Sequence, residues 1–504
     1  MYTEKGEVSG LKLYIFILMI MGSNSSQKIE LEPGLPSPLE RGTRGEVVIA
    51  IFDVGKTNKK LFLFDENYNI VFERTARFTE TVDEDGDACE NLESLRSSVF
   101  DSLHEVLNNK AFNVKAINFS TYGASFVHLD EAGNPVAPLY NYLKLYPDDL
   151  LRQFYDTYGG EAEFSNVTAS PVLGHLNSGM QLYWLKYKRP HVFKKIEHSL
   201  HLPQYMSFLI TGNYYSDITS IGCHTNLWNF TTNDYHEWVY KEGIFDKLGP
   251  MVSGEHVEYP FFSGAKYRVG VGLHDSSAAL IPYLVNFHEP FLLLSTGTWC
   301  ISLNPFNDQP LTSEELQCDC LSYMTYQGKP VKASRLFGGN EHEQQVKRIA
   351  EFFNLNTAKY KSLELNQEIL EDLQKINTPD KGLDTKALLK TSLFAERELS
   401  GFKNDEEAYH QLIMDIVTQQ YASTQLVLKG TPVKRIFVDG GFSNNQIYMK
   451  LLAASFPQLE VYAASMAQAT AVGTALSIHH SWNTKPFPNN LVELKYYSVN
   501  PTAI

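Results

Sequence analysis

The chain has 504 residues, which is too long for one ordinary hydrophobic core, so we expect at least two domains. Its 43% hydrophobic and 20% charged residues are typical of a soluble globular protein. The net charge of -15, from 43 basic and 58 acidic residues, argues against a general nucleic-acid binder, so any polyanionic ligand must be held by local donors.

The first 46 residues differ from the rest of the chain. An apolar run at 13–21 follows Lys5 and Lys12; it is too short to span a bilayer but has the length of a signal-peptide core. Residues 32–45 have the proline and glycine content of a disordered linker. We interpret residues 1–46 as a disordered extension or a start artefact, with export as the alternative.

An α/β domain is predicted next. An apolar strand at 47–53 runs through the turn 54–60 directly into a second strand at 61–64, with no helix signal between them. The predicted elements that follow along the chain are a strand at 70–74, an acidic loop at 83–87, an amphipathic helix at 91–107 and a strand at 115–120.

The first turn is not a P-loop. The sequence Gly55-Lys56-Thr57 would need a glycine at the position of Ala50 and a helix directly after the turn, where a strand is predicted. Asp53 could instead hold magnesium through water while Thr57, Asn58 and Lys60 meet phosphate oxygens. The alternative is a plain hairpin turn, and the presence of a similar turn downstream favours the phosphate interpretation.

Asp275 follows the apolar segment 269–273 and precedes a predicted helix at 278–281. It could be a helix N-cap. An ionised carboxylate there could also accept a proton from a substrate hydroxyl during phosphoryl transfer. The residues alone leave both interpretations open.

A second hairpin turn lies at 295–298, between apolar strands at 290–294 and 299–303. Exposed backbone N–H and hydroxyl groups in such a turn can converge on an anion. The predicted strands at 321–326 and 330–336 and the predicted helices at 343–353, 363–375 and 406–428 then loosely repeat the first half. Two such hairpins suggest a duplicated fold that grips a nucleotide from both sides.

The strand predicted at 435–439 leads into Gly440-Gly441 and Asn445. These residues could form only a turn and a cap, or they could let an adenine approach the backbone closely, because glycine has no Cβ. A small-residue segment at 467–475 is interpreted as a helix in ordinary core packing. His342-Glu343 is rejected as a zinc-protease motif, since Val346 stands where the second histidine would be.

The five cysteines are few, odd in number and scattered, so neither a disulfide framework nor a reactive pair is indicated. Cys318-Asp319-Cys320 lacks the spacing of a zinc site. A reducing compartment fits this usage best.

Taken in chain order, these motifs resemble those of the FGGY carbohydrate kinases, sugar kinases of the actin-like ATPase superfamily. The resemblance runs from about residue 47 to about residue 478. Its segments are similar to the family's first phosphate motif, middle region, catalytic-aspartate segment, second phosphate motif and adenosine motif, at 53–60, 202–220, 272–276, 295–299 and 439–445.

The resemblance implies two actin-like (ribonuclease H-like) ATPase domains around a central cleft. The sugar-side domain would span 47–286, the nucleotide-side domain 287–482, and a tail 483–504. ATP and Mg²⁺ are the implied cofactors, with Asp275 as general base and Asp53 organising Mg²⁺. The implied phosphate contacts are Thr57, Asn58, Lys60, Gly297 and Thr298; the adenosine contacts are Gly440, Gly441 and Asn445; the sugar contacts are Tyr122, Ala124, Tyr140, Asn141 and His274.

The implied activity is ATP-dependent phosphorylation of a ketose, either a pentulose or a deoxyhexulose such as L-fuculose or L-rhamnulose. Many pentulose kinases carry a tryptophan and an aspartate where this chain has Tyr140-Asn141-Tyr142, whereas 216–220 and 295–299 resemble deoxyhexulose kinases more closely. The alternatives are a nucleotide-gated actin-like binding protein and a sugar sensor without catalysis. We expect a cytoplasmic protein with no nucleic-acid or membrane partner; a homodimer stays open.

Overall fold

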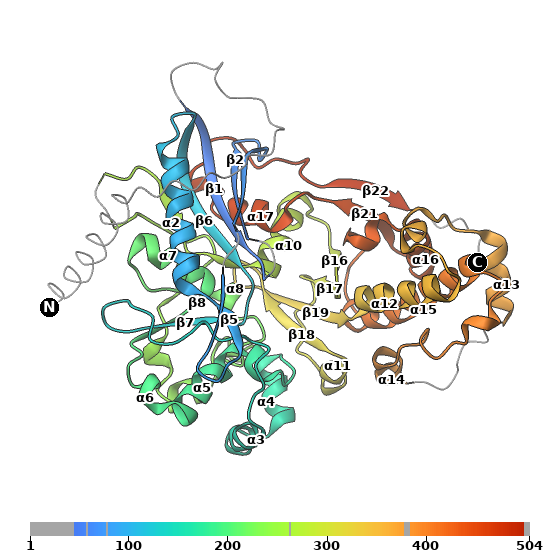
Figure 1. The fold of residues 1–504 in the computed structure, drawn as a ribbon, viewed down its shortest axis with the longest axis horizontal. Helices are drawn as coiled ribbons and strands as arrows, with labels where there is room; N and C mark the ends of the chain where they lie inside the picture. Colours follow the sequence, from blue (N-terminus) through green and yellow to red (C-terminus); the bar gives the residue numbers. More distant parts are fainter. Residues whose placement is uncertain (1–44, 57–58, 77–78, 262–263, 377–383, 498–504) are drawn as a thin grey trace.

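The computed structural model describes residues 45–56, 59–76, 79–261, 264–376 and 384–497. The interpretation of residues 1–46 therefore lies almost entirely outside the described residues. Figure 1 shows two lobes side by side, the N-terminal one in blue and green and the C-terminal one in yellow to red. Each lobe is built on a seven-stranded sheet.

The sheet of the N-terminal lobe has the order β13-β14-β6-β1-β2-β3, and β15 also pairs with β6. β1, β2 and β3 are antiparallel neighbours, while β1, β6 and β14 run parallel. The bounds of these strands are β1 Glu46–Val54, β2 Lys59–Asp65, β3 Ile70–Ala76, β6 Phe112–Thr121, β13 Val257–Glu258, β14 Arg268–Gly270 and β15 Leu273–His274.

The C-terminal sheet repeats this arrangement. Its order is β18-β19-β17-β16-β20-β21-β22, with β16, β17 and β19 antiparallel and β16, β20 and β21 parallel. The bounds are β16 Phe291–Thr296, β17 Cys300–Asn304, β18 Cys320–Met324, β19 Pro330–Leu336, β20 Arg435–Gly440, β21 Glu460–Ser465 and β22 Glu493–Tyr497. β1 and β16 hold equivalent positions, which confirms the predicted α/β class and its duplication.

Alternation along β1 explains how both faces of the first sheet are covered. Val48 and Ala50 face one core, with buried residues of α2 Leu92–Asn108 and α7 Leu202–Thr211. Ile49 and Ile51 face another, with residues of α10 Asp275–Asn286 and α17 Ala469–Ser477. Successive strand residues point to opposite faces, so a strand buried on both faces has to be apolar throughout.

One helix, α10, is shared by the two sheets. Its Ala278 and Ile281 pack on the N-terminal sheet, and its Leu280 and Tyr283 pack with Leu293 of the C-terminal sheet. α17 crosses it so closely that a Cβ on Gly473 would lie 1.9 Å from the Ala278 carbonyl oxygen. The small-residue segment therefore does serve core packing, as predicted, although the core belongs to the other lobe (Figure 1).

The remaining helices cover the outside. α12 Gly338–Phe352, α15 Asp405–Leu428 and α16 Gln446–Ser455 contribute to the core on one face of the C-terminal sheet. α3 Asp148–Thr157, α4 Glu161–Thr168 and α5 Ser178–Lys188 form a further core in the N-terminal lobe. Smaller elements used below are β4 Glu80–Val82, β5 Ala88–Glu90, α8 Ile218–Ile221, the 3₁₀ helices η3 Thr357–Ser362 and η5 Gly441–Asn444, and α13 Gln367–Ile376.

Candidate active site

Three carboxylates stand where strands or helices end at the centre of the molecule. Asp53 is next to last in β1, and its Oδ1 accepts a hydrogen bond of 3.0 Å from Ser120 Oγ. Asp275 begins α10, and its Oδ1 accepts from the Ser276 backbone N–H at 2.6 Å. Asp439 lies in β20 and accepts from the Tyr283 hydroxyl at 3.0 Å.

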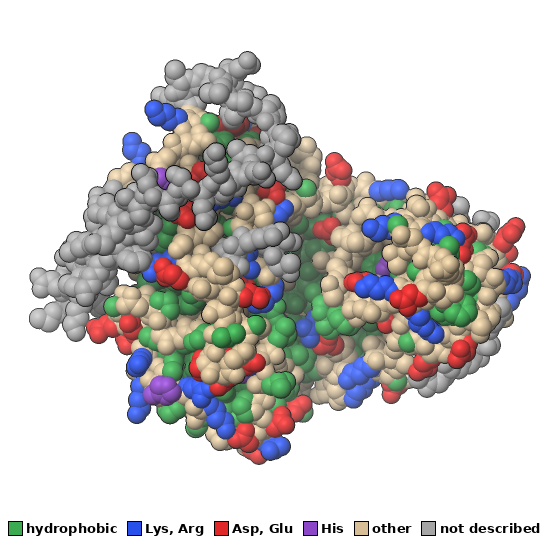
Figure 2. All heavy atoms as spheres, viewed as in Figure 1, with side chains coloured by type: hydrophobic (Ala, Val, Ile, Leu, Met, Phe, Trp, Pro, Cys, Tyr) green, Lys and Arg blue, Asp and Glu red, His purple; other side chains and the backbone are tan. Residues whose placement is uncertain are grey.

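Asp275 and Asp439 come from different lobes, yet both line one cavity of about 200 Å³. Ser295 of the second turn, Tyr323 and Thr470 line it too. Figure 2 shows charged side chains spread over both lobes and hydrophobic ones gathering where the lobes meet. The cavity therefore brings the predicted base of the N-terminal lobe to the strand ends of the C-terminal lobe.

Burial sets the acidity of the two N-terminal carboxylates. It raises the pKa of Asp275 to about 6, against the opposing effect of the Ser276 hydrogen bonds. Burial also raises the pKa of Asp53 to about 6; Ser120 lowers it, and the nearby charge of Asp275 adds to the increase. A carboxyl group with a pKa near 6 is largely ionised at neutral pH yet accepts a proton more readily than a free aspartate.

The second turn opens into a separate pocket of about 690 Å³ in the C-terminal lobe. Thr296, Gly297 and Thr298 line it on one side, and Gly441 and Asn445 on another. Four of the five residues predicted for this side of the nucleotide thus meet in one pocket: Gly297, Thr298, Gly441 and Asn445. The fifth, Gly440, lies directly beside it, where its ideal Cβ would be 2.0 Å from the Thr296 carbonyl oxygen.

Close backbone packing shapes this turn. A Cβ on Gly339, at the start of α12, would lie 1.8 Å from the Gly297 carbonyl oxygen, and the Asn340 N–H donates to the Thr298 carbonyl at 3.1 Å. Gly440 has φ 88°, a left-handed conformation that favours glycine. These contacts fix the turn with its Gly297 and Thr298 exposed to the pocket.

A hydrogen-bonded chain crosses the far wall of the same pocket. Asn445 Nδ2 donates to the Tyr409 hydroxyl at 2.8 Å, and that hydroxyl lies 3.1 Å from His342 Nε2. Asn445 Oδ1 meanwhile accepts from the Tyr448 N–H at the start of α16. Burial lowers the pKa of His342 to about 4, so the ring is neutral near pH 7. Asn445 therefore positions the wall rather than offering a free amide.

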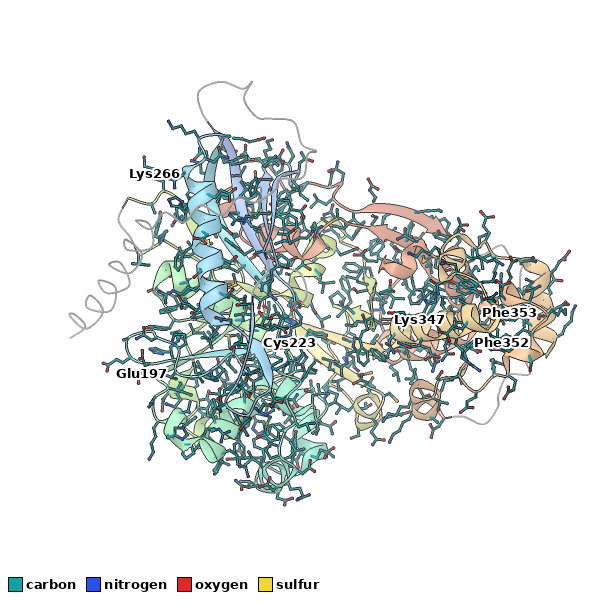
Figure 3. The ribbon with its side chains drawn as sticks, in the orientation of Figure 1. Glu197, Cys223, Lys266, Lys347, Phe352 and Phe353 are labelled. Carbon is teal, nitrogen blue, oxygen red and sulfur yellow. The ribbon has the colours of Figure 1, made fainter. Side chains whose placement is uncertain are left out.

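Several lining residues of this pocket were not predicted from the sequence. They are Gly339, His342, Glu343, Val346, Lys347, Thr357, Tyr360, Lys361 and Tyr409. They come from α12, η3 and α15; the sequence predicts helices over parts of α12 and α15, at 343–353 and 406–428, but no element at η3. The sequence singles out His342 only as part of a possible zinc-protease motif, and once that motif is rejected no other function is predicted for this histidine. Figure 3 labels Lys347 on α12 of the C-terminal lobe, where its side chain is exposed.

In the first turn, Thr57 and Asn58 lie outside the described residues. Lys60 is the cross-strand partner of Asp53, and its ammonium group is paired with Glu73 Oε1 at 2.7 Å in a partly exposed pair. Lys60 also lowers the pKa of Asp53 by its charge. It therefore lies on the same side of the sheet as Asp53, within reach of a ligand there.

The predicted sugar-side residues divide into two groups. Tyr122, Ala124 and His274 are buried near the end of β6; a Cβ on Gly123 would lie 2.7 Å from His274 Nε2, which itself lies 3.3 Å from Asp275 Oδ1. Burial lowers the pKa of His274 to about 4, so it is neutral near pH 7. Cys223 Sγ lies 3.6 Å from His274 Nε2, so the Cys223 label in Figure 3 shows where His274 lies between the two lobes.

Tyr140 and Asn141 are engaged elsewhere. The Tyr140 ring is buried, and its hydroxyl donates to Glu84 at 2.6 Å. The Asn141 amide donates to the Ala88 carbonyl at 3.1 Å. Their neighbour Tyr142 lies beside Tyr122, with 6.0 Å between the two ring centroids. Tyr140 and Asn141 are thus hydrogen-bonded within the N-terminal lobe, and their role as sugar contacts stays a prediction.

All five cysteines are buried and free, in agreement with the predicted absence of disulfides. Within the described ranges, no cluster of three or more His, Cys, Asp or Glu side chains could hold a metal ion. Mg²⁺ often uses only one or two carboxylates together with phosphate and water, so Asp53 fits it without such a cluster. No helix in the described part is long and apolar enough to cross a membrane.

Both lobes match one family. Residues 48–257 match the FGGY family of carbohydrate kinases, N-terminal domain, and residues 288–486 match the carbohydrate kinase FGGY, C-terminal domain. The chain belongs to the FGGY family. The first match ends at residue 257, within β13, and the second begins at residue 288, just after α10 ends at Asn286; β14, β15 and α10 lie between the two matches.

Individual FGGY relatives are distant. A rhamnulokinase of Yersinia pestis (strain Pestoides F) is 24% identical over 284 residues, which are 53% of this chain and 56% of the relative. The chain thus spans about half the length of the rhamnulokinases that it matches.

The fold itself is similar to solved FGGY structures. A carbohydrate kinase from Novosphingobium aromaticivorans has a TM-score of 0.72 at 21% identity, covering 90% of this chain and 96% of that one. Plasmodium falciparum glycerol kinase with ADP has a TM-score of 0.71 at 15% identity, covering 92% and 96%. The predicted actin-like arrangement of two domains is thereby confirmed.

Proposed function

We propose that this protein phosphorylates a ketose with ATP, using Asp275 as general base. The observation that carries the proposal is the position of Asp275: it belongs to the N-terminal lobe, yet it lines a cavity shared with Ser295 of the second turn and Asp439. Its pKa of about 6 suits a group that takes up a proton near neutral pH.

The residues divide the chemistry between the lobes. The turn at Gly297 and Thr298 offers backbone and hydroxyl donors to the phosphates, and the pocket beyond it has the size of a nucleotide site. Lys60 would approach the phosphates from the other lobe, and Asp53 and Asp439 would hold Mg²⁺ through water. Bound Mg²⁺ would neutralise charge on the phosphate oxygens.

In the transfer step, the sugar hydroxyl gives its proton to a carboxylate oxygen of Asp275. The sugar oxygen forms a bond to the γ-phosphorus while the bond from that phosphorus to the bridging oxygen of ADP breaks. The neutral His274 beside Asp275 adds no positive charge that would weaken the base. Closure of the two lobes would exclude water, which competes with the sugar for the phosphoryl group.

For the acceptor we propose a deoxyhexulose such as L-rhamnulose or L-fuculose, with a pentulose as the alternative. The rhamnulokinase relatives support the first class. We also propose a cytoplasmic location, which the need for ATP and the five free cysteines support. A panel of ketoses in a coupled ADP assay tests it.

The decisive variant is Asp275→Asn, which keeps the shape of the side chain but removes the base. We expect kcat to fall by about 10³-fold, within the range of general-base effects, with the dissociation constant of ATP unchanged by calorimetry. The exposed Asp149→Asn on α3 is the matched control. Unchanged turnover in Asp275→Asn would refute the assignment. ATP turnover that ignores every sugar would favour a nucleotide-gated binding protein, and ketose binding without ADP release would favour a sensor.

A further inference from the structure

The first turn carries a lysine, Lys56, whose side chain packs against aromatic rings of the N-terminal lobe. Lys56 Nζ lies 5.3 Å from the ring centroid of Tyr122 and 5.7 Å from that of Tyr142, both in the N-terminal lobe. An ammonium group within about 6 Å of two aromatic rings is attracted to both. Its side chain is 34% exposed, so a ligand can reach it. None of its contacts lines the pocket of the second turn.

Glu90, the last residue of β5, supplies the acidic partner. Its Oε1 lies 3.5 Å from Lys56 Nζ and 3.4 Å from Lys59 Nζ, and its side chain is 4% exposed. Its other oxygen, Oε2, is buried, and no donor in the described part of the chain meets hydrogen-bond geometry toward it, while the Tyr122 hydroxyl interacts with the Glu90 carboxylate and has its pKa raised by it. A buried carboxylate oxygen without a donor costs free energy, so this atom favours a ligand that brings one.

The charges around Glu90 allow Lys56 to turn toward a ligand. Lys59 is the more buried of the two lysines, at 9% exposed, and also donates to the Lys56 carbonyl at 3.1 Å. Two ammonium groups thus face one carboxylate. If Lys56 moves, Lys59 still neutralises Glu90, so the movement leaves no unpaired buried charge.

Tyr142 connects this group to the reaction centre. Burial raises the pKa of its hydroxyl, and the charges of Asp275 and Glu90 raise it further, so both carboxylates lie near this one side chain. Its ring also lies beside that of Tyr122. Tyr122 also precedes Gly123, whose ideal Cβ would lie 2.7 Å from His274 Nε2, and that nitrogen lies 3.3 Å from Asp275 Oδ1. Lys56 therefore packs on the chain segment that contacts the neighbour of Asp275.

We propose that Lys56 and Glu90 together bind one hydroxyl of the sugar, other than the hydroxyl that receives the phosphate. That hydroxyl accepts a hydrogen bond from Lys56 Nζ and donates one to Glu90 Oε2. A carboxylate at this position would meet Glu90 and have no proton to donate, so the arrangement selects neutral polyols over sugar acids. The inference rests on the proposed kinase function and names two residues that set its sugar specificity.

Monodeoxy analogues of the accepted ketose test the pair in wild type and Lys56→Met. In wild type, removal of the contacted hydroxyl should lower kcat/KM by about 10²-fold or more, because the buried groups lose their partner. In Lys56→Met, kcat/KM for the complete sugar should fall by about 10²-fold, while that for the same analogue should change less than about threefold. The KM for ATP should stay within about twofold.

Two further variants keep the result interpretable. Glu90→Gln keeps the size of the side chain but should remove the same discrimination, and calorimetric titration of sugar without ATP should show the same loss of affinity in both variants. Lys60→Met, from the same turn, should raise the KM for ATP instead.

A rise in the KM for ATP in Lys56→Met, or equal use of every deoxy analogue by wild type, would overturn the inference. If wild type phosphorylates no ketose, the proposed function fails instead. Sugar phosphorylation that is insensitive to Lys56→Met leaves that function intact and removes only the role of Lys56.

Discussion

The two hairpin turns hold equivalent positions in their sheets but are held by different forces. The first, after β1, is rich in lysine, and its ammonium groups are paired with Glu73 and Glu90. The second, after β16, has no charged residue and is fixed by backbone contacts with Gly339 and Gly440. Duplication preserved the strand order, whereas the chemistry of the two turns diverged.

This difference teaches how the work of the site is divided. Charges that can change partners lie in the N-terminal lobe, where the proposed mechanism moves a proton and recognises a sugar. Rigid donors lie in the C-terminal lobe, where a nucleotide with fixed geometry would bind. A substitution that adds one methyl group should therefore harm the second turn, while a change of charge or pH should act mainly through the first lobe.

Between the two turns, the largest effect is expected for Gly339→Ala. The added Cβ would lie 1.8 Å from the Gly297 carbonyl oxygen, so the second turn has to shift and its donors lose their alignment. We expect the dissociation constant of ATP to rise by about 10²-fold in calorimetry, with sugar affinity unchanged. Gly401→Ala, whose Cβ would meet nothing within 4 Å, is the control. Wild-type ATP affinity in Gly339→Ala would show that the turn does not bind phosphate.

The pH dependence should separate the lobes with a smaller effect. Asp275 has a raised pKa of about 6, so it is ionised above that pH and protonated below it. With a protonated base, kcat should fall about tenfold for each pH unit below 6. His342 has a pKa lowered to about 4 and stays neutral over the same range, so it adds no pH dependence to nucleotide binding. A flat kcat between pH 5 and pH 8 would contradict the role of Asp275.

The sequence predicts the strand order of both sheets well, because that order follows from local features of the chain. Both turns join apolar strands directly, and the order of antiparallel and parallel strands follows from that. The start of α12 was placed at 343 rather than Gly338, since two glycines are poor helix formers. The position of α17 on the opposite lobe depends on contacts such as Gly473 with Ala278, which are distant in sequence and leave no local pattern.

The site shows a sharper limit. Positions at strand ends, such as Asp53, Asp275 and Gly297, are predictable because α/β sheets place ligands there. In 140–142, by contrast, the direction of each side chain depends on irregular backbone, so the sequence does not reveal that Tyr142 lies beside Tyr122 while Tyr140 is buried and hydrogen-bonded to Glu84. Glu90 is a single acidic residue after an acidic loop, and only the folded hairpin of β4 and β5 brings it to Lys56.

The smallest effect is expected for Glu73→Gln. This variant removes the more exposed ion pair of the first turn, Lys60–Glu73, and leaves the buried carboxylate of Glu90 with its two lysines. Lys60 must leave Glu73 to meet a phosphate, and an exposed ion pair of this kind contributes about 0–1 kcal/mol. Releasing Lys60 should lower the KM for ATP by no more than about fivefold, and leave the KM for sugar unchanged, because 1 kcal/mol corresponds to about that factor. Steady-state kinetics with both substrates varied measures it. A higher KM for ATP would mean that Glu73 holds Lys60 in place for the nucleotide rather than competing with it.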